Sequence, residues 1–247
     1  MIGGMDGLSR MAPYSRGNMK VKTQSKKVNK AWLNQHVTDP WVRLAQKEGY
    51  RARAAYKLKE LDETYGLVQP GQCIVDLGCA PGAWCQYLRR RLGTVAGPDG
   101  QPRVRGVIVG LDLLPMEPID GVRFIQGDFR EEATLAALRA ALAEALGTEA
   151  AHRVDVVLSD MAPNLSGVES VDAARIEHLI ELAVEFAVQH LKPTGALVAK
   201  VFHGSAYDAA VRRFREHFRA VKVHKPKASR PQSAETFLVG LGLKGSG

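Results

Sequence analysis

Cysteine is scarce in this chain, and its pattern excludes two kinds of structure. The three cysteines among 247 residues, Cys73, Cys79 and Cys85, are too few for a disulfide framework, and their spacing of six matches no common zinc-binding pattern. The seven histidines include no H-x-x-x-H pair. We therefore expect small buried cysteines and no metal centre.

Long hydrophobic segments are also missing. No stretch approaches the roughly 18 uninterrupted apolar residues of a membrane helix, and residues 1–30 lack the apolar centre of a secretory signal. With 45% hydrophobic residues the chain can still bury a core, as one large domain or two small ones. We expect a soluble cytoplasmic protein with no membrane partner.

The positive charge lies almost entirely at one end of the sequence. Residues 1–59 hold 13 Lys/Arg against 3 Asp/Glu, whereas the other 188 residues hold 21 against 23. A neutral body with a basic arm is typical of a protein that meets a phosphate backbone. A disordered, solubilising tail is the alternative, and a mitochondrial transit peptide fits less well because the arm favours Lys over Arg.

The N-terminal third divides into an arm and the start of a folded domain. Residues 1–30, rich in Gly, Ser, Lys and Asn, are predicted to be disordered, and residues 31–247 to form a single domain. Asp39 and Pro40 are typical of the first residues of a helix that ends at Gly49. A second helix is predicted from about Arg51 to Tyr65.

From residue 73 onward, short apolar strands alternate with helices. This alternation predicts an α/β fold with a mostly parallel sheet that is covered by helices on both faces. The Gly/Pro-rich stretch "GTVAGPDGQPRV" is predicted to be a surface loop. The predicted strands are "CIVDLG", "GVIVGLDLL", "VRFIQGD", "VDVVLS", "ALVAKVF", "AVKVHK" and "TFLVGLGL".

Acids and glycines stand where the predicted strands end. The first strand runs into "VDLGCAPGAW", where Gly78 and Gly82 let the backbone turn tightly beside a ligand, without the G-x-G-x-x-G of a dinucleotide fold. Asp112 could accept both hydroxyls of a ribose, and Asp128 could meet an adenine amino group. One acid after a strand is usually a turn former. Three acids at successive strand ends, Asp112, Asp128 and Asp160, beside a glycine loop predict an S-adenosylmethionine site.

Two later strands each carry a charged residue. "VDVVLSDMAPN" is an apolar strand that stops on Asp160, where a following proline prevents a helix. "GALVAKVFHG" places Lys200 inside an apolar strand, where a lysine must be neutral, paired or directed into a polar cleft. The alternative is an edge strand with a solvated lysine.

These motifs together resemble one known family. The chain looks like the FtsJ/RrmJ (RlmE) family of ribosomal RNA large subunit 2′-O-methyltransferases over about residues 30–242. The resemblance implies a Rossmann-like methyltransferase fold with a mostly parallel seven-stranded sheet. It rests on "GYRARAAYKLKELD", "VDLGCAPGAWCQYL", "GLDLLPM", "QGDF", "SDMAPNLSG", "AKVFHG" and "SRPQSAETFLVG".

The resemblance also implies a catalytic tetrad. Matching the family's Lys-Asp-Lys-Glu motif by motif gives Lys57, Asp160, Lys200 and Glu235. Lys200 would act as the base that removes the proton of the acceptor hydroxyl, or would steer the ribose oxygen while another acceptor takes the proton. The two acids would orient Lys200 and keep the cluster near neutrality. No metal is needed.

The implied donor is S-adenosylmethionine, released as S-adenosylhomocysteine. The family usually has Ala-Pro-Gly-Gly-Trp where this chain has "APGAW", with Ala83 in place of the second glycine. Ala83 would be strained by roughly 1 kcal/mol if φ were positive, but we expect it to open a helix and be benign. The implied donor contacts are Gly82, Trp84, Asp112, Asp128 and Asp160.

The implied substrate is a uridine ribose in 23S ribosomal RNA, within an assembling large subunit, and we expect a monomeric enzyme. No aromatic base-stacking module such as an RRM is evident, which favours recognition of a large structured RNA by a basic surface. Two alternatives stay open. The tetrad could serve tRNA or another RNA, or the protein could be an assembly factor that binds donor and RNA without turnover.

Deleting residues 1–30 should weaken RNA association and flatten its dependence on salt, because fewer counterions are released on binding. Donor binding should not change. Filter binding of RNA across a salt series measures the effect. Unchanged RNA affinity would identify the arm as a solubilising tail.

Overall fold

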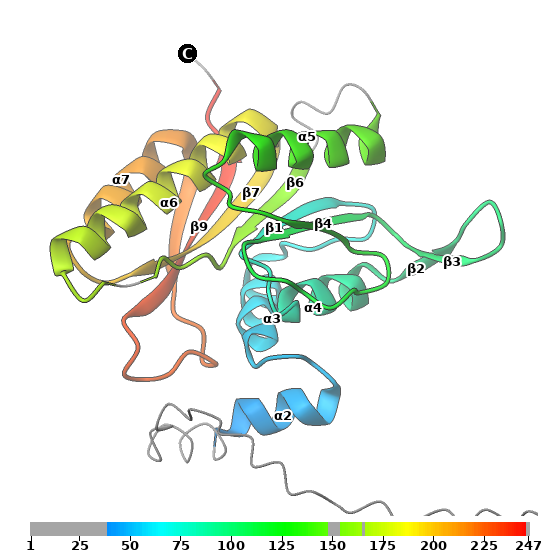
Figure 1. Ribbon diagram of the computed structural model, residues 1–247, viewed down its shortest axis with the longest axis horizontal. Coiled ribbons are helices and arrows are strands. Elements are labelled where there is room, and N and C mark those ends of the chain that lie inside the picture. The colour runs from blue at the N-terminus through cyan, green and yellow to red at the C-terminus, as the bar shows by residue number, and fades with distance from the viewer. Residues whose placement is uncertain (1–38, 148–153, 165, 246–247) are drawn as a thin grey trace, which may run out of the picture. The chain divides into compact units, whose positions relative to one another are not determined.

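The core of the fold is a seven-stranded sheet with the order β5-β4-β1-β6-β7-β9-β8 (Figure 1). The computed structural model describes residues 39–147, 154–164 and 166–245, so the predicted arm lies outside the described residues. The strands are β1 (Cys73–Leu77), β4 (Val107–Asp112), β5 (Arg123–Gln126), β6 (Val154–Ser159), β7 (Leu191–Phe202), β8 (Phe218–His224) and β9 (Glu235–Leu243).

Five neighbouring strands of this sheet are parallel. β1 pairs in parallel with β4 on one side and with β6 on the other, while β9 runs antiparallel between β7 and β8. The chain therefore builds the sheet outward from β1 through β4 and β5, then reverses to add β6 and β7. Ligands of such sheets bind at the carboxyl ends of the strands, where the order reverses. Here that point lies between β1 and β6.

Helices cover both faces of the sheet, as predicted (Figure 1). One face packs against α3 (Ala54–Tyr65) and α4 (Ala83–Leu92), and the other against α5 (Glu132–Leu146), α6 (Glu169–His190) and α7 (Tyr207–His217). All five residues of β1 are buried, which explains its nearly unbroken apolar sequence. Within the described residues, no helix is long and apolar enough to cross a membrane.

The first described helix, α2 (Pro40–Glu48), has the predicted ends. Asp39 accepts a hydrogen bond from the backbone N–H of Trp41 at 2.9 Å, and Gly49 is left-handed at φ 71°. α3 begins three residues later than predicted, because Arg51 makes hydrogen bonds outside the helix. Its backbone N–H donates to the Gln86 side chain at 2.7 Å, and its guanidinium donates to three backbone carbonyls.

The stretch predicted to be a surface loop is instead a β-hairpin. β2 (Thr94–Ala96) and β3 (Pro102–Val104) pair antiparallel as a sheet of their own. The backbone N–H of Gly97 donates to Gln101 O at 2.8 Å and closes the turn. β2 is wholly exposed, so its residues need no apolar alternation, and the sequence gives no strand signal.

Candidate active site

A cavity of about 660 Å³ lies at the carboxyl ends of the parallel strands. Asp112 follows from β4, Asp128 from the end of β5 and Asp160 from the end of β6, and all three acids line this one cavity with Lys200 of β7. The structure therefore brings together the acids that the sequence places after separate strands. Such a volume is within the usual range for a small-molecule site.

Gly78 and Asp112 shape the floor of the cavity. Gly78 has φ 79°, and a Cβ at this position would lie 2.8 Å from the backbone nitrogen of Met161, so only glycine fits. One carboxylate oxygen of Asp112 accepts from the N–H of Ala80 at 2.8 Å, and the other accepts from the N–H of Leu114 at 2.8 Å. These bonds fix the carboxylate beside the glycine loop.

Asp128 is held by a neighbouring arginine. The Arg130 guanidinium contacts both oxygens of the Asp128 carboxylate at 2.6–3.1 Å. Its hydrogen bonds lower the pKa of Asp128, against the opposing effect of partial burial. Asp128 therefore faces the cavity as a carboxylate.

Two of the predicted donor contacts, Gly82 and Trp84, lie outside the residues that line the cavity. Gly82 has φ 104° and faces the side chains of Ile119 and Met116, while the indole N–H of Trp84 donates to Ala54 O at 2.8 Å. Their contacts with the donor stay predictions. Ala83 is the first residue of α4, which confirms the expectation that it opens a helix.

The loop after β6 also lines the cavity. Residues 160–164 are neither helix nor strand, as the proline predicts. The guanidinium of Arg175 in α6 donates to Asn164 O at 2.8 Å. This bond ties the end of the loop to α6. The sequence alone indicated no contact for Asn164.

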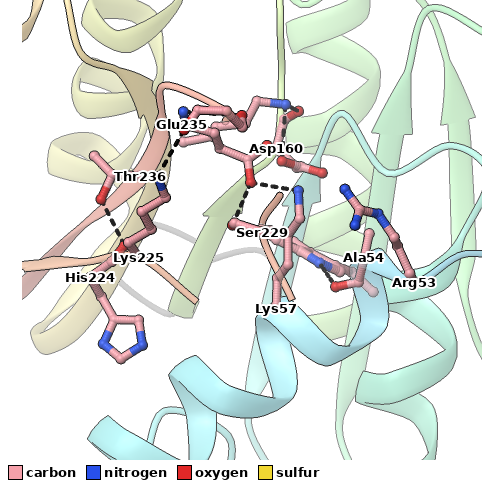
Figure 2. Close-up of polar contacts among 12 residues, drawn as sticks. Arg53, Ala54, Lys57, Asp160, His224, Lys225, Ser229, Glu235 and Thr236 are labelled. Atoms are coloured by element: carbon pink, nitrogen blue, oxygen red, sulfur yellow. Dashed lines mark hydrogen bonds and ion pairs between the residues drawn. The ribbon is translucent and has the colours of Figure 1, made fainter. Parts of the chain in front are cut away.

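Beside the cavity, the four residues of the predicted tetrad form two ion pairs, and Figure 2 shows the pair of Lys57 and Glu235. Lys57 Nζ of α3 is 2.6 Å from Glu235 Oε1 at the start of β9. Lys200 Nζ of β7 is 3.0 Å from Asp160 Oδ1 and donates a hydrogen bond to the backbone carbonyl of Asp160 at 2.6 Å. Two cations and two carboxylates from four separate elements thus meet in one cluster.

Lys200 lies in the interior of the sheet. β7 is paired with β6 on one side and β9 on the other, and the Lys200 side chain is 10% exposed. This position excludes the alternative of a solvated lysine on an edge strand. A largely buried ammonium needs partners. Asp160 supplies two, its backbone carbonyl and its carboxylate.

Glu235 carries its negative charge inside a mostly buried setting. Burial by itself raises the pKa of Glu235, but Lys57, the hydroxyl of Ser229 and the more distant charge of Lys200 outweigh it, so the pKa is lowered. Ser229 Oγ donates to Glu235 Oε1 at 2.9 Å, as Figure 2 shows. The role of Ser229 was missed at the sequence level because only the fold brings it to the carboxylate.

Asp76 is a second residue that the motif reading missed. It lies within β1, is fully buried, and accepts a hydrogen bond from Cys85 Sγ at 3.2 Å, while its Oδ1 has no hydrogen-bond partner among the described residues. Burial raises the pKa of Asp76 to about 7, and the charges of Asp160 and Asp112 add to the effect. This carboxyl group is therefore protonated below neutral pH in the folded protein.

Replacing Asp76 with asparagine should remove a pH dependence of stability. Between the usual pKa of 3.8 and about 7, the folded state binds a proton that the unfolded state has lost, so the free energy of unfolding falls as pH rises. Relative to Asp76→Asn, the wild type should lose roughly 4 kcal/mol across this window. Urea unfolding of both proteins at stepped pH measures it. Parallel pH curves would contradict the assigned burial effect.

A family model for FtsJ-like methyltransferases matches residues 50–243, which include every residue of the two ion pairs. This chain belongs to the FtsJ-like methyltransferase family. The membership confirms the resemblance carried by the motifs. It also gives the cavity a chemical context, because methyltransferases of this family need a bound methyl donor next to an acceptor.

Named relatives of this FtsJ-like methyltransferase are close in sequence. A protein named ribosomal RNA large subunit methyltransferase E from Paracidovorax citrulli is 66% identical over 92% of this chain and 100% of its own length. A protein of the same name from an Acidovorax species is 65% identical over 93% and 100%. A solved structure of a ribosomal RNA methyltransferase from Plasmodium falciparum, 30% identical, has a TM-score of 0.64 over 80% of this chain and 100% of its own.

Proposed function

We propose that this protein transfers a methyl group from S-adenosylmethionine to the ribose 2′-hydroxyl of a uridine in 23S ribosomal RNA. The observation that carries the proposal is the pairing of Lys57 with Glu235 and of Asp160 with Lys200 beside a cavity that Asp160 and Lys200 both line. The names of the relatives support the RNA and the large subunit as the site of action. An enzyme with this substrate works among the ribosomes of the cytoplasm.

The cavity suits the proposed donor. Asp112 and Asp128 present two carboxylates, one for ribose hydroxyls and one for the adenine amino group, and Gly78 leaves the space that a side chain would fill. The donor supplies a methyl group on a sulfonium, which is already reactive toward an oxygen nucleophile. The residues of the chain therefore have to orient the acceptor oxygen and remove its proton.

Lys200 is the residue placed to act on that proton. Its Nζ has three possible hydrogen-bond directions. The backbone carbonyl of Asp160 takes up one of them, and Asp160 Oδ1 lies 3.0 Å from Nζ as an ion-pair partner. As a neutral amine, Lys200 would accept the hydroxyl proton and be stabilised by Asp160 as it became an ammonium. Lys57 and Glu235 would hold the ribose from the other side and keep the cluster neutral.

The choice of substrate is tested by comparing methyl transfer to several RNA acceptors. The protein is incubated with labelled S-adenosylmethionine and isolated ribosomal RNA, large subunits or tRNA, and the 2′-O-methyl positions are mapped. We expect methylation of one uridine in the large-subunit RNA. Methylation confined to tRNA would replace the proposed substrate, and binding without transfer to any RNA would identify an assembly factor.

A further inference from the structure

One aromatic pair at the carboxyl edge of the sheet has no part in the proposed mechanism. His203 directly follows β7, and its imidazole stacks on the ring of Tyr207, with centroids 4.6 Å apart and planes inclined by 29°. Tyr207 is the first residue of α7 and packs partly buried against the hydrophobic core, whereas His203 is exposed. The tyrosine therefore supports an imidazole that faces solvent.

The pair lies beside the two strands that carry the proposed catalytic groups. Phe202 pairs with Glu235 across β7 and β9, and the next backbone N–H, that of His203, donates to Ala234 O at 2.9 Å. His203 is three residues beyond Lys200, and three residues of extended chain span roughly 10 Å. His203 lies just past the end of β7, so it stands at the carboxyl edge of the sheet and not on the strand face that carries Lys200 and Phe202. A nucleotide that crosses this edge from a ribose held at Lys200 would bring a base to the imidazole.

Apart from the stack on Tyr207, no polar contact among the described residues holds the His203 side chain in place. Among the described residues, the His203 side chain makes no hydrogen bond or ion pair, so it satisfies no buried polar group. Holding a surface side chain in one orientation costs rotamer entropy. Proteins that bind single-stranded RNA use exposed aromatic rings, histidine included, to stack on unpaired bases.

We propose that His203, supported by Tyr207, stacks on a nucleobase of the RNA substrate next to the target ribose. This inference rests on the proposed function and adds to it a positioning residue. His203 does not touch the reacting atoms. It orients the acceptor nucleotide so that the 2′-oxygen meets Lys200, and it supplies the base contact that the sequence did not reveal.

Steady-state methyl transfer with a series of His203 variants tests the stack. His203→Ala should raise the KM for RNA by about 5- to 150-fold, the range for loss of one base stack, with a smaller change in kcat. His203→Phe should restore the KM, whereas His203→Leu, which is apolar but lacks a π-face, should not. Donor affinity should stay at the wild-type value in each case. His217→Ala, at the far end of α7, is the matched control and should behave as wild type.

Two results would overturn the stacking role. One is a wild-type KM for His203→Ala, and the other is recovery by leucine equal to that by phenylalanine, which would indicate packing alone. A wild-type protein that methylates no RNA would instead overturn the proposed function. In that case, RNA affinities of the same variants, measured without turnover, decide separately whether His203 stacks.

Discussion

Replacing Lys200 with alanine should nearly abolish methyl transfer while donor binding persists. General acid–base catalysis contributes about 10²- to 10⁴-fold, and we expect a loss of that order in kcat. The side chain is 10% exposed, and its Nζ lies 2.6 Å from Asp160 O, so no solvent group can readily take its place. Single-turnover methyl transfer is measured with the RNA that the wild type methylates, and donor binding is measured by calorimetry. Together they separate the two effects.

A control in the same strand makes the Lys200 result specific. Lys192 also lies in β7 and pairs with Asp155 Oδ1 at 2.6 Å, but it is 42% exposed and does not line the cavity. Lys192→Ala therefore removes a lysine–aspartate pair without touching the proposed site and should keep the wild-type rate. Retained transfer by Lys200→Ala would remove Lys200 from the mechanism. Equal losses in both variants would indicate damage to β7.

The elements that could be predicted from sequence are those with local causes. The bounds of α2 follow from an acid that caps the first turn, a proline and a left-handed glycine, all within the helix or next to it. Likewise, the strand signals of β1 and β6 are runs of apolar residues that need burial on both faces. The strand ends then place Asp112 and Asp160 on one edge, because parallel strands end together.

The remaining features depend on contacts between distant parts of the chain. Lys57 and Glu235 are 178 residues apart in sequence, and only the packing of α3 beside β9 brings them to 2.6 Å. Their membership of one site was therefore available from the family resemblance and not from any local pattern. The pairing of Glu235 with Lys57 was not predicted, because both acids were expected to orient Lys200. The protonated state of Asp76 has the same origin, since a single acid in an apolar strand does not reveal whether a partner will be present.

Exposed structure was missed for a different reason. The β2–β3 hairpin is held by backbone hydrogen bonds and buries little, so its sequence shows no hydrophobic alternation. The stack of His203 on Tyr207 joins the end of a strand to the start of a helix, and the loop between them carries no motif for it. Patterns of hydrophobicity report burial, and both β2 and the His203 side chain are exposed.

The second large effect should come from replacing Gly78 with alanine. Gly78 has φ 79°, so a side chain is strained there, and the added Cβ would lie 2.8 Å from Met161 N and 2.9 Å from Met161 Cγ. Because a backbone atom cannot move aside alone, the loop from Asp160 to Asn164 must shift, and this loop lines the cavity. We expect donor affinity to fall by at least about tenfold, a cost of 1.4 kcal/mol.

Gly66→Ala separates the clash at Gly78 from backbone strain. Gly66 ends α3 with φ 65°, but no atom lies within 4 Å of a Cβ built there, so its replacement carries the strain of a left-handed alanine without a contact. Gly66→Ala should therefore lower stability by about 1 kcal/mol and leave donor binding intact. Calorimetric titration with S-adenosylhomocysteine and thermal unfolding measure both quantities. If Gly78→Ala bound this product as tightly as Gly66→Ala, the close approach of β1 and the Met161 loop would not shape the donor site. The donor would then not bind at the β1–β6 junction.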